Sequence, residues 1–87
     1  MNTEEKILQV TNEIKDLLIA KNRKYGDSAL SPVRIFSKAD AIEQIKIRID
    51  DKLSRISNGH GEDLDEDTVI DLIGYLVLLR VAQDDRF

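Results

Sequence analysis

Apolar residues recur with helical spacing along three stretches of the 87-residue chain, and almost no stretch alternates as a strand does. The first stretch runs from about Thr3 to Ala20, after Asn2 or Thr3 as a cap. The second follows Asp40, with Glu43 three residues on, and ends near Ser57. The third is the segment 69–82. The pattern predicts a single all-α domain over residues 1–87, with three main helices.

Each of the first two stretches carries one apolar stripe, expected to face the core. The stripes consist of Ile7, Val10, Ile14, Leu17 and Leu18 in the first, and Ile42, Ile45, Ile49, Leu53 and Ile56 in the second. Ile47 points away from the second stripe, which indicates an additional contact. The third stretch is apolar on nearly every side. Two neighbouring helices of one small chain cannot easily cover so much apolar surface. We therefore expect a homodimer or higher homo-oligomer that completes a helical bundle.

Composition narrows the class of protein. Hydrophobic residues make up 41% of the chain and charged residues 34%, which suits a folded helical domain. A net charge of −4 argues against direct nucleic-acid binding but leaves room for a local basic cluster. The longest apolar stretch contains Asp71 and Arg80 and is too short to span a membrane. The polar, acidic start argues against a signal peptide, and cysteine is absent, so we expect a cytoplasmic protein.

A long connection separates the first two predicted helices and contains the helix-breaking residues Gly26 and Pro32. Connections of this length in so small a domain are more often functional than idle. Its Asn22, Lys24 and Tyr25 offer an amide, an ammonium and an aromatic ring, which suit a base and its phosphates. Tyr25 packing on the core as a lid is an equally consistent interpretation.

Asp71 lies inside the apolar third stretch, where an unpaired carboxylate is costly. Asp67 lies one turn earlier on the same face, so the two carboxylates together predict a divalent-cation or nucleotide site. Two interpretations of Lys52 and Arg55 are open: they bind phosphate, or they form structural ion pairs with these acids. The acids from Glu62 to Glu66 suit the start of the third helix, where the helix dipole favours negative charge. His60 lies in a glycine-flanked turn and is not expected to be catalytic.

Three segments in order, Lys21 to Asp27, Ile47 to Ile56 and Glu66 to Tyr75, carry a resemblance to a known family. They resemble the nucleotide-modification-associated domain of phages and prophages. That group is similar to the all-α nucleoside triphosphate pyrophosphohydrolases of the MazG and dimeric dUTPase-like class. The resemblance implies a helical oligomer in which acids of two antiparallel helices hold Mg²⁺ against nucleotide phosphates.

Under this resemblance Asp67 and Asp71 match the second carboxylate pair of the metal site. The first pair departs from the family pattern, because the Glu-x-x-Glu of the enzymes is replaced by candidates such as Asp51, Asp50 and Glu43. Lys52 and Arg55 would face phosphate, while Asn22, Lys24 and Tyr25 would cover the ligand. The implied functions are Mg²⁺-dependent pyrophosphohydrolysis, or nucleotide binding without turnover.

Two other functions stay open. The first is a small phage-encoded inhibitor of a host enzyme or defence system, such as an anti-CRISPR protein, because the chain is compact and acidic and its acidic motif is reduced. The second is a purely structural helical oligomer, in which Asp71 pairs with Lys52 or Arg55 of another helix.

Overall fold

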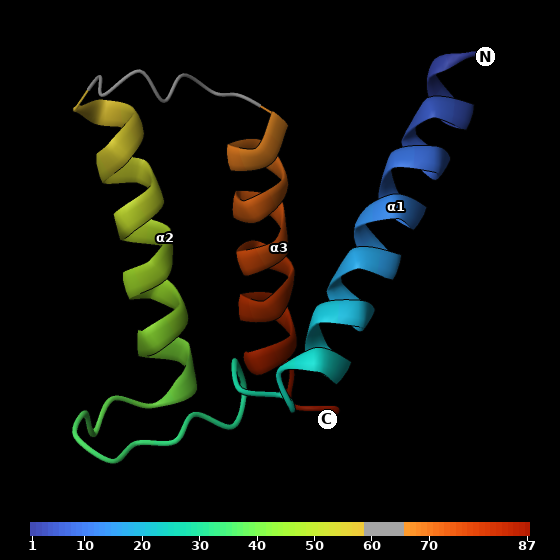
Figure 1. The fold of residues 1–87 in the computed structure, drawn as a ribbon. Helices are drawn as coiled ribbons and strands as arrows, with labels where there is room; N and C mark the ends of the chain where they lie inside the picture. The colour runs from blue at the N-terminus through green and yellow to red at the C-terminus, as the bar shows by residue number, and fades with distance from the viewer. Residues whose placement is uncertain (59–65) are drawn as a thin grey trace.

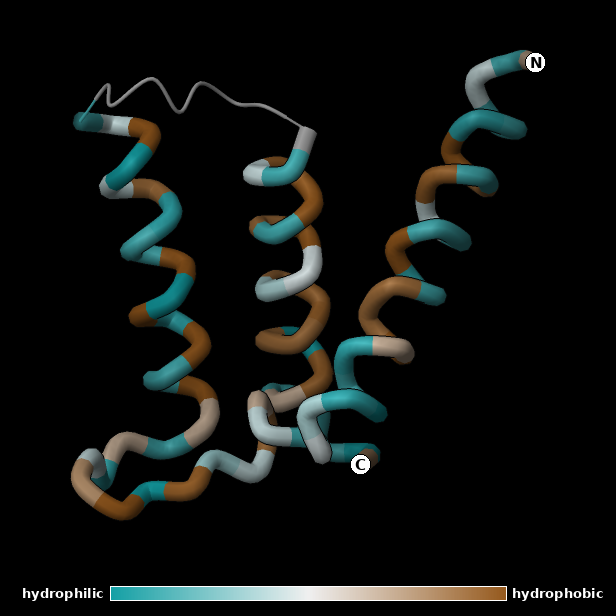
Figure 2. Tube along the Cα trace, in the orientation of Figure 1, coloured by the Kyte–Doolittle hydropathy of each residue, from teal (hydrophilic) through white to brown (hydrophobic). Residues whose placement is uncertain are grey.

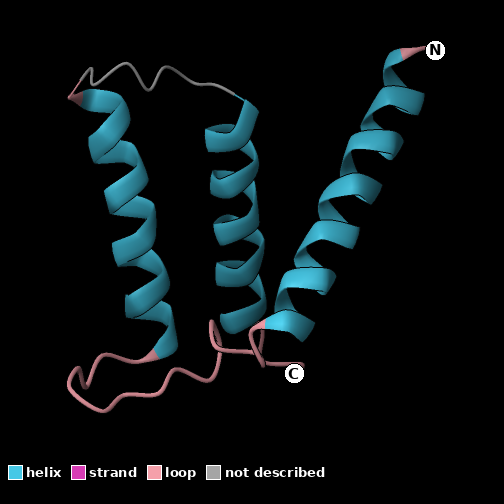
Figure 3. Cartoon of the chain, viewed as in Figure 1, coloured by secondary structure: helices cyan, strands magenta, loops and turns pink. Residues whose placement is uncertain are grey.

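The computed structural model describes residues 1–58 and 66–87, which fold into helices α1 (Thr3–Lys24), α2 (Ala41–Ser57) and α3 (Glu66–Ala82). These ranges contain no strand, so the predicted all-α class with three main helices is confirmed. Helices α2 and α3 lie side by side, and α1 leans away from α3 toward its N-terminus (Figure 1, Figure 3). No helix in the described ranges is long and apolar enough to cross a membrane.

Side chains that cap the backbone explain where the first two helices begin. At α1 the Asn2 carboxamide oxygen accepts from the Glu5 amide at 2.8 Å, and the Glu5 carboxylate accepts from the Asn2 amide at 3.3 Å. At α2 the Asp40 carboxylate accepts from the Glu43 amide at 2.9 Å, as its position predicted. Helix α1 continues four residues past the predicted end at Ala20, through basic residues that suit the negative end of a helix dipole.

The helices bury few side chains completely. Ile14 of α1 and Ile45 of α2 are the buried large apolar side chains in the described ranges, while Leu53 and Ile47 are about half exposed, at 50% and 53%. Apolar segments follow the whole length of α1, including the part that leans away from α3 (Figure 2). The predicted stripes are therefore present, but the chain covers them only in part.

Helix α1 approaches α3 closely at Gly74. A Cβ atom built on Gly74 would lie 3.1 Å from the Leu18 Cδ2 atom, tighter than an ordinary contact. Glycine allows this approach, although it lowers the helix propensity of α3 by about 1 kcal/mol relative to alanine. The contact lies within one turn of Lys21, so it also helps to position the site described below.

The chain after α3 is fixed by an ion-pair cluster. Asp84 lies 3.4 Å from Arg80 and 2.6 Å from Arg86. The hydrogen bonds from the Arg86 side chain and backbone lower the pKa of Asp84, and the same side-chain contact raises the pKa of Arg86. This cluster holds the C-terminal turn against the end of α3.

We predict that Gly74→Leu destabilises the fold by about 1 to 3 kcal/mol, because overpacking against Leu18 pushes α1 away from α3. Gly74→Ala is the graded control, since its gain in helix propensity offsets a smaller steric strain. Urea unfolding followed by circular dichroism measures both variants. Equal stability of Gly74→Leu and Gly74→Ala would contradict a close α1–α3 contact at this position.

Candidate functional site

The Asp71 carboxylate of α3 lies between lysines from the other two helices. Lys52 Nζ of α2 is 3.0 Å from Asp71 Oδ2, and Lys21 Nζ of α1 is 3.9 Å from Asp71 Oδ1. The Asp71 and Lys52 side chains are 32% and 20% exposed, so this contact is largely withdrawn from water. The pairing of Asp71 with Lys52 that the sequence offered as an alternative is thus present.

The other two candidate metal ligands stand apart from this ion pair. Asp67 lies one turn earlier on α3, and Asp51 lies on α2 next to Lys52; both are exposed. Within residues 1–58 and 66–87, no three His, Cys, Asp or Glu side chains are grouped so that they could hold a metal ion. A cation at Asp71 Oδ2 would have to displace the Lys52 ammonium.

A cleft of about 650 Å³ opens beside Asp71, between the C-terminal part of α1, the α1–α2 connection, the first turns of α2 and the middle of α3. This volume lies in the range of small-molecule sites. Polar and aromatic side chains of all four segments line it: Lys21, Asn22, Tyr25, Ser28, Arg34, Ser37, Gln44, Arg48, Asp71 and Tyr75. Its apolar lining includes Leu18, Pro32, Ile45 and Leu78.

Positive charge predominates in this cleft. Lys21, Arg34 and Arg48 line it, against the single carboxylate of Asp71, which Lys52 already compensates. The whole chain has a net charge of −4, so this cluster is a local exception to the overall charge. Guanidinium and ammonium groups around a partly apolar cleft suit an anionic ligand that carries a ring.

Two tight backbone turns place the connection over the cleft. Gly26 and Asp27 both have φ of +61°, and the Asn22 side-chain amide donates to Asp27 Oδ1 at 2.9 Å. Arg34 also has a positive φ of +56°, and its Nη2 donates to the Lys38 carbonyl at 2.8 Å. These hydrogen bonds hold conformations that non-glycine residues rarely adopt. The two turns thereby fix the positions of Tyr25 and Arg34 in the wall of the cleft.

The five predicted ligand-binding residues are only partly brought together. Asn22 and Tyr25 line the cleft, whereas Lys24 places its ammonium 5.3 Å from the centre of the Tyr25 ring. Lys52 holds Asp71 from the α2 side, and Arg55 lies exposed further along α2. His60 and the acids Glu62, Asp63 and Asp65 lie outside the described residues.

Sequence reasoning missed Gln44 and Arg48, although a signal for them existed. Gln44, Arg48 and Lys52 are spaced four residues apart and therefore share one face of α2. Gln44 and Arg48 line the cleft, and Lys52 reaches Asp71 one turn further on. Arg34 offered no such signal, because its place depends on the backbone of the connection.

Comparison with known proteins found no matching family model, no matching curated protein and no matching solved structure. The resemblance to nucleotide-modification-associated domains therefore stays a prediction carried by the motifs themselves.

We predict that Asp71→Asn lowers the free energy of unfolding by about 2 kcal/mol, because it leaves the ammonium of the largely buried Lys52 side chain without its carboxylate. Asp67→Asn is the matched control: it makes the same change one turn earlier, at an exposed position, and should stay within about 0.5 kcal/mol of the native chain. Urea denaturation compares the two. Equal effects would mean that the Asp71 ion pair adds nothing to stability.

Proposed function

We propose that the chain binds a nucleotide in the cleft beside Asp71. The observation that carries this proposal is the convergence of Lys21 from α1, Arg34 from the connection and Arg48 from α2 on one cleft. Phosphate oxygens are the biological anions that such a set of ammonium and guanidinium groups binds well. The motif resemblance to nucleotide-modification-associated domains points to the same ligand class.

The rest of the lining suits the base and sugar. Tyr25 and Tyr75 bring aromatic rings to the cleft, and rings of this kind stack on a planar base. The amide of Gln44 provides a donor and an acceptor for the edge of a base or a sugar hydroxyl. The Asn22 amide already bonds Asp27, so its part is to shape the turn that carries Tyr25.

We propose that Mg²⁺ binds together with the nucleoside triphosphate. Mg²⁺ in proteins is usually held by one or two carboxylates plus substrate phosphates and water. Asp71 and Asp67, four residues apart on α3, are the carboxylates assigned to it, with Asp51 of α2 as a third candidate. Because Lys52 occupies Asp71 Oδ2, binding of Mg²⁺ there requires that Lys52 gives way. Hydrolysis of the triphosphate to a monophosphate and pyrophosphate would follow only if the ion takes that place.

A homo-oligomer is part of the same proposal. Large apolar side chains of α1 and α3 stay exposed in a single chain, among them Ile7, Val10 and Leu76. A chain of 87 residues gains much from burying such surface against another subunit.

We predict that a nucleoside triphosphate raises thermal stability, by about 3 kcal/mol at roughly a hundredfold excess over Kd, or several degrees for a domain of this size. Arg48→Gln should remove most of this shift, because it removes a cation from the cleft. Lys46→Gln is the matched control on the same helix, because Lys46 lies outside the cleft lining and pairs with Glu43 at 3.3 Å.

The assay uses differential scanning fluorimetry with triphosphates and inorganic phosphate, each with and without Mg²⁺. A shift that is equal in Arg48→Gln and the native chain would contradict binding in this cleft. No shift with any nucleotide would contradict the proposed function itself. Release of pyrophosphate, measured on the same samples, separates turnover from binding.

One observation favours the alternative, an inhibitor that binds a host protein. The connection exposes three large apolar side chains close together, with Val33 at 76%, Ile35 at 83% and Phe36 at 99% exposure. Exposed aromatic and aliphatic groups of this kind often anchor protein interfaces.

Under the alternative, Phe36→Ser should abolish stoichiometric binding of a purified host target, because it removes the largest exposed apolar side chain of the connection. Asp71→Ala should leave that binding intact, since Asp71 lies on α3 and pairs with Lys52. Isothermal titration calorimetry measures both variants. Unchanged binding by Phe36→Ser would rule out this surface as the anchor.

A further inference from the structure

Helix α1 leaves most of its apolar stripe uncovered. Only Ile14 of α1 is buried, whereas Ile7, Val10 and Leu17 remain 57%, 49% and 37% exposed. The N-terminal half of α1 leans away from α3 (Figure 1). Most helical stability in proteins comes from packing of an apolar face, so a 22-residue helix that packs mainly through its second half lacks much of its support.

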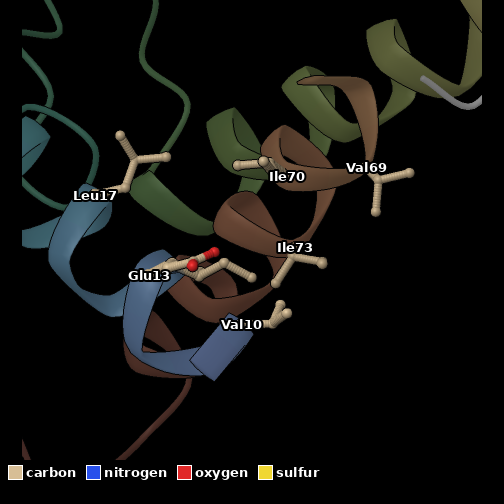
Figure 4. Close-up of a pocket in the computed structure, with 7 residues that line it drawn as sticks. Val10, Glu13, Leu17, Val69, Ile70 and Ile73 are labelled. Carbon is tan, nitrogen blue, oxygen red and sulfur yellow. The ribbon is translucent and has the colours of Figure 1, made fainter. Parts of the chain in front are cut away.

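The space between α1 and α3 is an apolar groove of about 360 Å³. Val10 and Ile73 point into it from the two helices, with Glu13 as its acidic member (Figure 4). On α3, Leu76 and Val77 follow Ile73 of the groove by three and four residues and therefore share its side of the helix. With Val69 they form an apolar strip, with exposures of 38% for Val69, 53% for Leu76 and 41% for Val77. The stripe of α1, the groove and the α3 strip are together called the α1–α3 face.

The charges of α1 indicate what covers this face. The first half of the helix, residues 3–13, carries three glutamates and one lysine, and the second half, residues 14–24, carries four basic residues and one aspartate. The helix is therefore negative toward its start and positive toward its end. A second copy of α1 in antiparallel orientation brings opposite charges together at both ends, whereas a parallel copy brings like charges together.

We propose that the α1–α3 face is a self-association surface on which a second copy of this chain docks with its α1 antiparallel. A twofold axis near the middle of α1 then places the same apolar patch of each copy on the other. The proposal rests on the homo-oligomer proposed above and gives it a surface and an orientation. Nucleotide binding is tested separately, because the cleft shares no lining residue with the groove.

The first test is the oligomeric state, measured by sedimentation equilibrium over a range of concentrations. The native chain should be a dimer, and Val10→Glu should abolish the dimer by placing a charge in the groove. Leu8→Glu is the matched control, because Leu8 lies on the same helix, is 58% exposed and does not line the groove. Circular dichroism checks that both variants stay helical.

The second test measures how the two α1 helices are oriented, by disulfide cross-linking of single-cysteine variants. The native chain contains no cysteine that could interfere. Lys6→Cys and Lys24→Cys place single thiols on the same side of α1, separated by 18 residues, or about 27 Å. In an antiparallel dimer, a mixture of the two variants should form disulfide-linked dimers under mild oxidation. Neither variant alone should do so.

Each result decides the proposal. A native chain that stays monomeric at hundreds of micromolar overturns it, and so does a helical Val10→Glu variant that remains dimeric. Cross-links within each single variant, but not between them, overturn the antiparallel arrangement. If Val10→Glu loses its helices, disulfide cross-linking in the mixture of Lys6→Cys and Lys24→Cys decides between the two outcomes.

Discussion

The contact between the Asp71 carboxylate and the Lys52 ammonium is the constraint on which the rest of the structure depends. Helix α3 is apolar on nearly every side, and a carboxylate in such a helix needs a cation close by. Lys52 provides it from α2 at 3.0 Å, and Lys21 approaches from α1 at 3.9 Å. One side chain therefore ties α3 to both other helices.

The same constraint shapes the two open regions of the molecule. Helix α1 meets α3 at Lys21 and at the Leu18–Gly74 contact, both in its C-terminal half. The cleft forms on one side of this junction, with Lys21 in its wall, and the apolar groove forms on the other side. A charged ligand site and an apolar surface thus arise from one junction without sharing side chains.

Much of the fold could be predicted from the sequence, because local chemistry decides it. The Asn2 and Asp40 caps act through the residues next to them, and the start and end of α2 agree with the predicted ones. The α1 end was placed four residues early, because the basic residues after Ala20 looked like a connection although they suit a helix C-terminus. How far α1 leans from α3 depends on long-range contacts, which no local pattern encodes.

The candidate site was predictable only in part. The apolar sequence around Asp71 indicated that a cation must neutralise its carboxylate. An ion pair with Lys52 was one of the interpretations that the sequence left open. Arg48 could have been found from its spacing to Lys52 on α2. Arg34 could not, because it reaches the cleft through a positive φ of +56° in the connection, a conformation that its sequence does not signal.

A double-mutant cycle between Asp71 and Lys52 measures whether this ion pair ties α3 to α2. Urea denaturation of Asp71→Asn, Lys52→Met and the combined variant gives the coupling free energy between the two side chains. We expect a favourable coupling of about 1 kcal/mol or more, because the pair is largely withdrawn from water. Strictly additive effects of the two substitutions would contradict it, and Asp71 would then not be the residue that ties the helices together.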